Sequence, residues 1–211
     1  MTTRIALVTL LAALVLPSAV AQADNPRLVA VVGTNDAFVI SLRDANGNAL
    51  TQLAPGTYDI AVSDRSESHN FHLKGPGVDH STPIGEKQET TWTVTIGDGR
   101  YTYVCDAHAS QMRGYFLAGA IAPTAFTGSV GPKKSISLRP KSALPGPATV
   151  TVNDRSKTDN FHLTGPGVNK KTGLKTRGKV TWTVTLQPGV YRYRSDKTNK
   201  LRGSFVVNFP S

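Results

Sequence analysis

The sequence predicts an all-β protein made of two tandem β-sandwich domains. Three observations support this fold class. A segment of roughly 90 residues occurs twice, apolar residues alternate with polar ones at a period of two, and turn residues separate these alternating segments. No stretch shows a sustained apolar period of 3.6 residues, which an amphipathic helix would require. Short strands at this spacing are typical of β-sandwiches.

The expected strands of the first half follow one another between turns. Pro55-Gly56 precedes a strand over residues 57–62. Threonine alternates with apolar residues over 91–96, and residues 101–105 are rich in aromatic and β-branched side chains. Gly97–Gly99 provides the turn between these two strands. The counterparts in the second half are residues 145–146, 148–152, 181–186 and 187–189.

The first 23 residues predict an export signal. Arg4 supplies a positive charge, residues 5–16 form an apolar run, and Ala21-Gln22-Ala23 is a small-x-small cleavage site. A short membrane anchor is the alternative, but the run is short and has no stop-transfer flank. No apolar run of about 20 residues follows. We therefore expect a periplasmic or extracellular protein without a transmembrane segment.

The chain after this signal contains one sequence twice. Residues 62–66, 70–73, 75–78 and 91–95 match residues 152–156, 160–163, 165–168 and 181–185 at a constant offset of 90. One residue is then lost, so that Arg113-Gly114 matches Arg202-Gly203. We therefore predict two domains, over residues 24–122 and 123–211.

The two halves differ in charge. Residues 24–122 contain seven lysines and arginines against eleven acidic residues, whereas residues 123–211 contain sixteen against three. The basic second half is either a solvated face or a surface that adheres to an anionic envelope polymer, lipid headgroups or an acidic redox partner. Nucleic acid is not an expected partner, because the chain is predicted to be exported and has no recognition motif.

The first half alone carries a set of metal-binding side chains: His69, Cys105, His108 and Met112. Cys105 is the only cysteine of the sequence, which excludes an internal disulfide framework and any site of four cysteines. A thiolate, two imidazoles and a weak axial thioether are the donors of a type 1, or blue, copper site. These four residues therefore predict one type 1 copper ion.

The second half serves as a comparison, since it replaces all four candidate ligands together. Their positions are held by Asp159, Ser195, Thr198 and Leu201. In contrast, His72 persists as His162. We expect His72 to point away from the site, because Phe71 and Leu73 form the apolar face of that strand.

Three alternatives concern the site itself. Gln111 is a competing axial donor beside Met112. Cys105 and His108 could also form a nucleophile pair, but they lie on one tight loop and no oxyanion donors are evident. The Tyr-x-Tyr-x-Cys run is similar to strand F of an immunoglobulin domain, which would require a second cysteine on an earlier strand.

The first half resembles a cupredoxin of the plastocyanin or pseudoazurin type, and the second half resembles a degenerate copy of one. The resemblance rests on His69-Asn70, on residues 101–105 and on Cys-x2-His-x3-Met followed by Gly114. It implies an eight-stranded Greek-key sandwich with copper beneath loops at one end. It also implies electron transfer through the edge of His108 and an Asn70 side chain that ties the two ligand loops together. Plastocyanin-like chains have four residues between this histidine and methionine and amicyanin has two, whereas this chain has three.

The expected function is that of an exported type 1 copper protein that carries single electrons to or from a redox partner protein. The alternatives are copper scavenging, buffering or delivery without electron shuttling, and a secreted adhesion module that uses the basic second domain. Multicopper oxidases and copper nitrite reductases resemble the chain in architecture only. Their type 1 cysteine is flanked by a histidine, whereas Cys105 lies between Val104 and Asp106. We therefore expect that the protein is not an enzyme.

Overall fold

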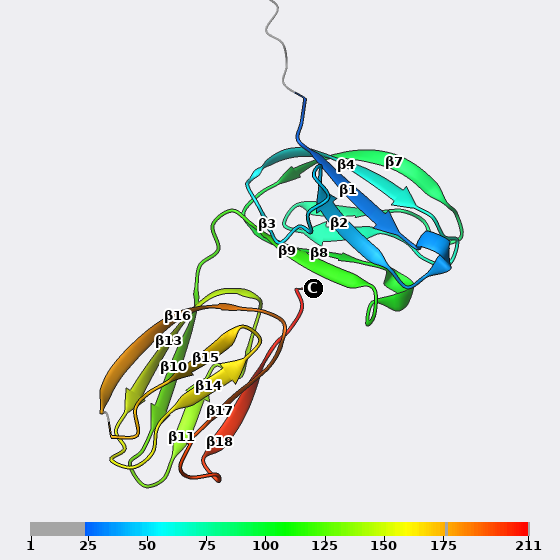
Figure 1. Cartoon of the computed structure of the whole chain (residues 1–211). Coiled ribbons are helices and arrows are strands. Elements are labelled where there is room, and N and C mark those ends of the chain that lie inside the picture. The colour runs from blue at the N-terminus through cyan, green and yellow to red at the C-terminus, as the bar shows by residue number, and fades with distance from the viewer. Residues whose placement is uncertain (1–23, 176, 211) are drawn as a thin grey trace, which may run out of the picture.

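The structure is a computed structural model that describes residues 24–175 and 177–210. The predicted export signal lies outside these residues. Strands form nearly all of the regular structure, and Figure 1 shows them gathered into two sandwiches that are joined by one connection. The all-β fold class of two Greek-key sandwiches is therefore confirmed.

The first sandwich consists of a four-stranded and a five-stranded sheet. The four-stranded sheet has the order β2-β1-β4-β7 and the five-stranded sheet the order β3-β9-β8-β5-β6. β1 runs parallel to β4 and β3 parallel to β9, while the other pairs are antiparallel. The strands are β1 (Arg27–Val32), β2 (Ile40–Asp44), β3 (Gln52–Leu53), β4 (Gly56–Asp64), β5 (His72–Gly75), β6 (Val78–Ser81), β7 (Gln88–Ile96), β8 (Gly99–Val104) and β9 (Arg113–Ala118).

The second sandwich repeats this topology strand for strand. Its sheets have the orders β11-β10-β13-β16 and β12-β18-β17-β14-β15. As in the first sandwich, two pairs are parallel. The first strand, β10, runs parallel to the long central strand β13, and the short edge strand β12 runs parallel to the last strand β18. The strands are β10 (Thr124–Val130), β11 (Ile136–Arg139), β12 (Ser142–Ala143), β13 (Gly146–Asp154), β14 (His162–Gly165), β15 (Val168–Lys171), β16 (Gly178–Leu186), β17 (Gly189–Arg194) and β18 (Arg202–Val207).

Each core forms between the two sheets from every second residue of the long strands. In β4 the buried positions alternate with half-buried ones, as the period-two pattern requires. Tyr101 is fully buried, and its hydroxyl donates to the carbonyl of Pro76. A Cβ at Gly75 would lie 2.1 Å from the Tyr101 ring, so only glycine fits beneath it. Tyr191 and Gly165 repeat this arrangement in the second core.

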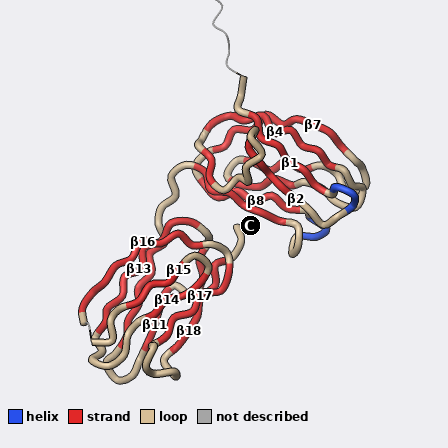
Figure 2. Tube along the Cα trace, in the orientation of Figure 1, coloured by secondary structure: helices blue, strands red, loops and turns tan. Residues whose placement is uncertain are grey.

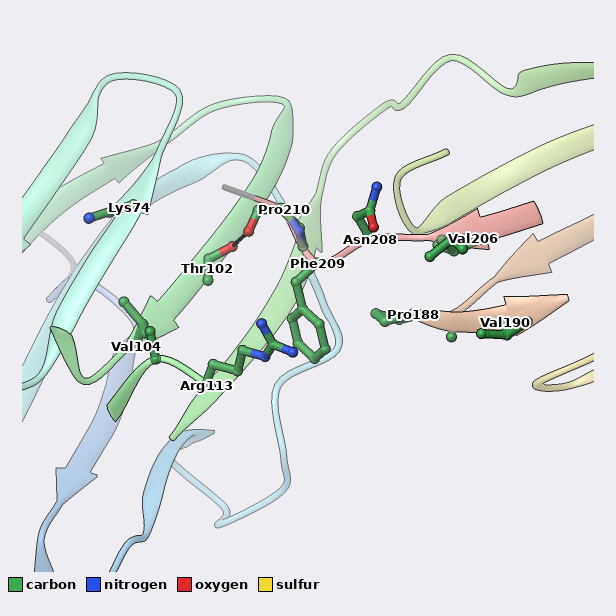
Figure 3. A pocket seen from close by; sticks show the side chains of 13 residues that line it. Lys74, Thr102, Val104, Arg113, Pro188, Val190, Val206, Asn208, Phe209 and Pro210 are labelled. Carbon is green, nitrogen blue, oxygen red and sulfur yellow. Dashed lines mark hydrogen bonds between the residues drawn. The ribbon is translucent and has the colours of Figure 1, made fainter. Parts of the chain in front are cut away.

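The end of β18 leads into the first sandwich and helps to dock the two sandwiches. Thr102 donates a hydrogen bond to the carbonyl of Pro210 at 2.9 Å, and the guanidinium of Arg113 lies 4.1 Å from the centre of the Phe209 ring. Arg100 donates to the carbonyl of Pro145 at 2.6 Å. Figure 3 shows Arg113 and Phe209 side by side at a hollow of about 690 Å³ between the sandwiches.

Two 3-10 helices, η1 (Thr34–Asp36) and η2 (Asp106–His108), are found among the described residues. Figure 2 shows both of them at the same end of the first sandwich, which brings the β1–β2 connection beside the segment that follows β8. In the part of the chain that the structure describes, no helix has the length and apolar character needed to cross a membrane.

Candidate metal centre

His69 lies in the connection between β4 and β5, and a set of buried hydrogen bonds gives this connection its shape. The carboxylate of Asp64 accepts hydrogen bonds from the backbone N–H of Ser66 and from the hydroxyl of Thr82. The Ser66 hydroxyl in turn accepts from the N–H of Ser68 at 3.0 Å. Burial outweighs the hydrogen bond from Thr82, so the pKa of Asp64 is raised above its usual value. The hydrogen bonds of Asp64 and Ser66 fix the turn that places His69 inside the sandwich, where it is 1% exposed.

Cys105 and Met112 lie at the two ends of a loop that closes on itself. The N–H of Cys105 donates to the carbonyl of Met112, and the N–H of Met112 donates to the carbonyl of His108, both at 2.9 Å. The N–H of His108 donates to the carbonyl of Cys105 at 3.0 Å. These bonds turn the chain after β8 by one 3-10 turn, so that His108 folds back over the cysteine.

The donor atoms of His69, Cys105 and His108 converge. The two Nδ1 atoms are 2.9 Å apart, and Cys105 Sγ lies 3.7 Å from that of His69 and 3.6 Å from that of His108. A point in the plane of these three atoms lies about 2 Å from each of them. Bonds from histidine nitrogen and cysteine sulfur to a first-row metal ion are about 2.0–2.3 Å long. The triangle therefore fits a single metal ion.

A hydrogen bond on the far side of the His69 ring orients its donor nitrogen. Nε2 of His69 lies 3.4 Å from the backbone carbonyl of Asp36. Because a carbonyl only accepts, Nε2 must carry the proton, which leaves the lone pair on Nδ1 free to face the cluster. Such outer contacts commonly fix the tautomer and ring orientation of a metal-binding histidine.

Phe38 is a functional candidate that sequence reasoning missed. Its ring packs edge-on against both imidazoles, at centroid distances of 5.2 Å to His69 and 4.7 Å to His108. Phe38 is 54% exposed, so one side of its ring is open to solvent while the other covers the two imidazoles. One sequence signal could have found it: residues 34–39 separate Gly33 from Ile40, whereas only residues 132–135 separate Gly131 from Ile136. The hydrogen-bonded turns, which close from Gly33 to Val39 and from Gly131 to Ser135, match this difference. The first half therefore has two extra residues here, and Phe38 is one of them.

Met112 and Gln111, the two candidate axial donors, differ in burial. Met112 is fully buried in the core of the first sandwich, beside Cys105, whereas Gln111 is exposed. The burial of Met112 beside Cys105 therefore favours its thioether over the Gln111 amide as the candidate axial donor. His72 lies on β5 outside the cluster, as expected from the strand alternation, and its Nδ1 contacts the carboxylate of Asp106 at 2.8 Å.

Asn70 joins the two segments that carry the donors. Its Nδ2 donates to the carboxylate of Asp106 and its Oδ1 accepts from the N–H of Asp106, both at 2.8 Å. Burial raises the pKa of Asp106, but hydrogen bonds from Asn70 and His72 outweigh it and hold that pKa below its usual value. Since Asp106 directly follows Cys105, this pair fixes the distance between the His69 segment and the cysteine.

In the second sandwich the corresponding positions form hydrogen bonds to one another. The Ser195 hydroxyl donates to the buried carboxylate of Asp159 at 2.8 Å, and the N–H of Thr198 donates to the Ser195 hydroxyl at 3.1 Å. Asn160 keeps the same pair of bonds to Asp196 that Asn70 makes to Asp106. The scaffold is thus retained, while the donor positions are replaced by a hydrogen-bonded filling.

No protein-family model and no curated protein matches the chain. Among solved structures, it is similar to a copper-containing nitrite reductase (NirK) from Thermus scotoductus SA-01, with 11% identity, a TM-score of 0.29 and coverage of 88% of this chain and 61% of the reductase. This chain therefore spans about three fifths of that enzyme.

Two small copper proteins are also similar to this chain. Reduced rusticyanin has 21% identity and a TM-score of 0.31 over 44% of this chain and 78% of its own. Auracyanin A, a "blue" copper protein from the green thermophilic photosynthetic bacterium Chloroflexus aurantiacus, has 16% identity and a TM-score of 0.30 over 44% of this chain and 98% of its own. At such scores these likenesses carry no weight for activity. The predicted likeness to cupredoxins holds for the fold, which is cupredoxin-like.

The sequence-based exclusion of enzymatic activity is wrong. Similar solved structures include the nitrite reductase and a blue copper oxidase from Nitrosomonas europaea, which has 11% identity and a TM-score of 0.28 over 87% of this chain and 85% of its own. The expectation depended on the residues that flank Cys105. A fold that serves in enzymes as well as in carriers does not decide between them.

Proposed function

We propose that the protein is an exported type 1 copper protein that carries single electrons. His69, Cys105 and His108 would hold the ion, and Met112 would supply a weaker fourth donor. The observation that carries the proposal is the triangle of two Nδ1 atoms and one sulfur, with edges of 2.9, 3.6 and 3.7 Å. We also propose two domains, 24–122 with the ion and 123–211 without it, because the second half replaces all four candidate ligands.

The chemistry of the donor set suits copper in both oxidation states. Copper held by these residues would supply one-electron chemistry between its Cu(II) and Cu(I) states. Thiolate and thioether favour Cu(I), while imidazole binds either state. The hydrogen bonds of Asn70, Asp106 and Asp36 hold the donors in place before metal arrives, so that little rearrangement is needed when the charge of the ion changes.

The His108–Phe38 corner is the proposed place where electrons enter and leave. His69, Cys105 and Met112 are each at most 1% exposed, whereas His108 is half-buried and Phe38 is 54% exposed. A partner that docks here would contact the edge of His108 beside an apolar ring. Phe38 would exclude water from the two imidazoles and offer apolar contact area to that partner.

The copper absorption spectrum of the protein tests this proposal. Adding Cu(II) to the chain without residues 1–23 should produce intense visible absorption near 600 nm, and Cys105→Ser should abolish it. Ser195→Ala, the matched change in the second half, should leave the spectrum intact. A colourless complex, or equal spectra for wild type and Cys105→Ser, would refute the type 1 site. Reversible one-electron voltammetry should accompany the blue colour, and an irreversible response would refute the carrier role.

A further inference from the structure

The second sandwich carries a basic hollow at the end that corresponds to the metal end of the first. A hollow of about 300 Å³ is lined by residues from three separate segments: the β10–β11 turn, the connection after β13 and the residue before β16. Five cationic side chains line it, all of them exposed. They are Lys133, Lys134, Arg155, Lys157 and Arg177. We call these five residues the basic pole.

The positive charge of the basic pole is not neutralised by the rest of the described chain. Over residues 24–175 and 177–210, none of the five cations forms an ion pair within 4.0 Å. One acid, Asp159, also lines the hollow, but its carboxylate accepts hydrogen bonds from Ser195 and Thr158. Five cations around one carboxylate leave a clear excess of positive charge facing the hollow.

The same end of the first sandwich shows that the fold does not require this charge. Lys133 and Lys134 correspond to Asn35 and Asp36, because both pairs follow the equivalent glycine by two and three residues and share the left-handed conformation. Lys157 corresponds to Glu67 by the offset of 90. The shared fold therefore accepts neutral or acidic residues at three of the five positions.

The two lysines of the turn are costly residues for their backbone conformation. Lys133 has φ 62° and Lys134 φ 50°, and asparagine and aspartate adopt this left-handed region far more readily than lysine does. Local conformation alone would favour asparagine and aspartate, the pair that the first half has at Asn35 and Asp36. Backbone strain of this kind concentrates at functional positions, and here both strained residues contribute charge to the same hollow.

We propose that the basic pole binds a phosphate-bearing anion. A cluster of unpaired lysine and arginine side chains around a small hollow matches a compact group with several acceptor oxygens and more than one negative charge. Phosphate supplies both, either in a soluble phosphate compound or in a lipid headgroup. The anion would occupy the end of the second sandwich that corresponds to the copper end of the first, and the two sites are independent of each other.

Isothermal titration calorimetry with pyrophosphate tests the proposal on the chain without residues 1–23. Lys133→Asn with Lys134→Asn removes two charges from the basic pole and introduces a residue that favours the left-handed turn. Arg192→Thr with Arg194→Val removes two charges from β17 and introduces the residues that β8 has there. We expect pyrophosphate affinity to fall about tenfold in the first variant and less than twofold in the second, because Arg192 and Arg194 are not among the residues that line the hollow.

Three results would overturn the proposal: no binding of pyrophosphate at low salt, equal losses in both variants, or binding that does not weaken as salt is added. Sedimentation with phosphatidylcholine vesicles, with and without phosphatidylglycerol, identifies the source of the phosphate. Vesicle binding that the Lys133 and Lys134 changes abolish assigns a lipid headgroup, and pyrophosphate binding alone assigns a soluble compound. The copper spectrum should be unchanged in both variants.

Discussion

Replacing Asn70 by alanine should separate what this residue does for the fold from what it does for the metal centre. The Asn70 side chain is 2% exposed and makes two hydrogen bonds of 2.8 Å to Asp106. A hydrogen bond to a charged group contributes about 1.5–3 kcal/mol and a neutral one about 0.5–1.5 kcal/mol. We therefore expect Asn70→Ala to lower the free energy of unfolding of the first sandwich by about 2–4 kcal/mol.

The repeat offers a matched control, since Asn160 makes the same two bonds to Asp196 at 3.0 and 2.8 Å. Asn160→Ala should destabilise the second sandwich by a similar amount. With a urea dependence of about 1–3 kcal/mol/M, each change shifts the unfolding midpoint of its own sandwich by roughly 1–2 M. Urea titration of the metal-free variants measures both shifts.

The metal affinity should distinguish the two variants. Loss of a contact that orients metal ligands commonly lowers affinity by about 10- to 100-fold. We expect that loss for Asn70→Ala and none for Asn160→Ala, measured by competition with a chelator through the visible absorption. If Asn70→Ala keeps the wild-type copper affinity while it is destabilised as predicted, the reasoning that Asn70 fixes the ligand segments is refuted.

Three further predictions concern other parts of the molecule. Phe38→Ala should speed removal of bound copper by a chelator several-fold, because the apolar cover of the imidazoles is lost; an unchanged rate would contradict this role. Hydrogen bonds from Thr198 and other neighbours lower the pKa of Asp159, so its ionised form stabilises the second sandwich above about pH 4 and this contribution is lost as the pH falls through the lowered pKa. Urea titrations between pH 5 and pH 3 should show that loss, and Asp159→Asn should remove it. Phe209→Ala should loosen the docking of the two sandwiches, which would appear as more independent tumbling in NMR relaxation while both cores stay folded.

Much of the fold could be predicted from the sequence, because the information is local and repeated. Threonine alternating with apolar residues over 91–96 determines which face of β7 is buried, and the second copy over 181–186 repeats the pattern. Histidine, cysteine and methionine are rare in this chain, and their joint loss from the second half singled them out before any geometry was known.

The missed features depend on contacts between distant segments. Phe38 contacts the histidines only because the β1–β2 connection folds over the β8 end, and no periodic pattern records that approach. Docking of the sandwiches depends on Thr102 and Arg113 meeting residues about 100 positions further along the chain, beyond the range of local patterns. The exclusion of enzymatic activity was wrong because it took the neighbours of one cysteine as decisive for the whole protein.

The shortened turn after β10 limits any attempt to engineer a second copper centre. Installing histidine at 159 and 198, cysteine at 195 and methionine at 201 would restore the donor types, yet the β10–β11 turn has no counterpart of Phe38 and the cysteine loop is one residue shorter. A working transplant would also need both insertions. Reversing the divergence of the two halves therefore requires changes of chain length as well as of side chains, so the two copies differ by more than the four exchanged side chains indicate.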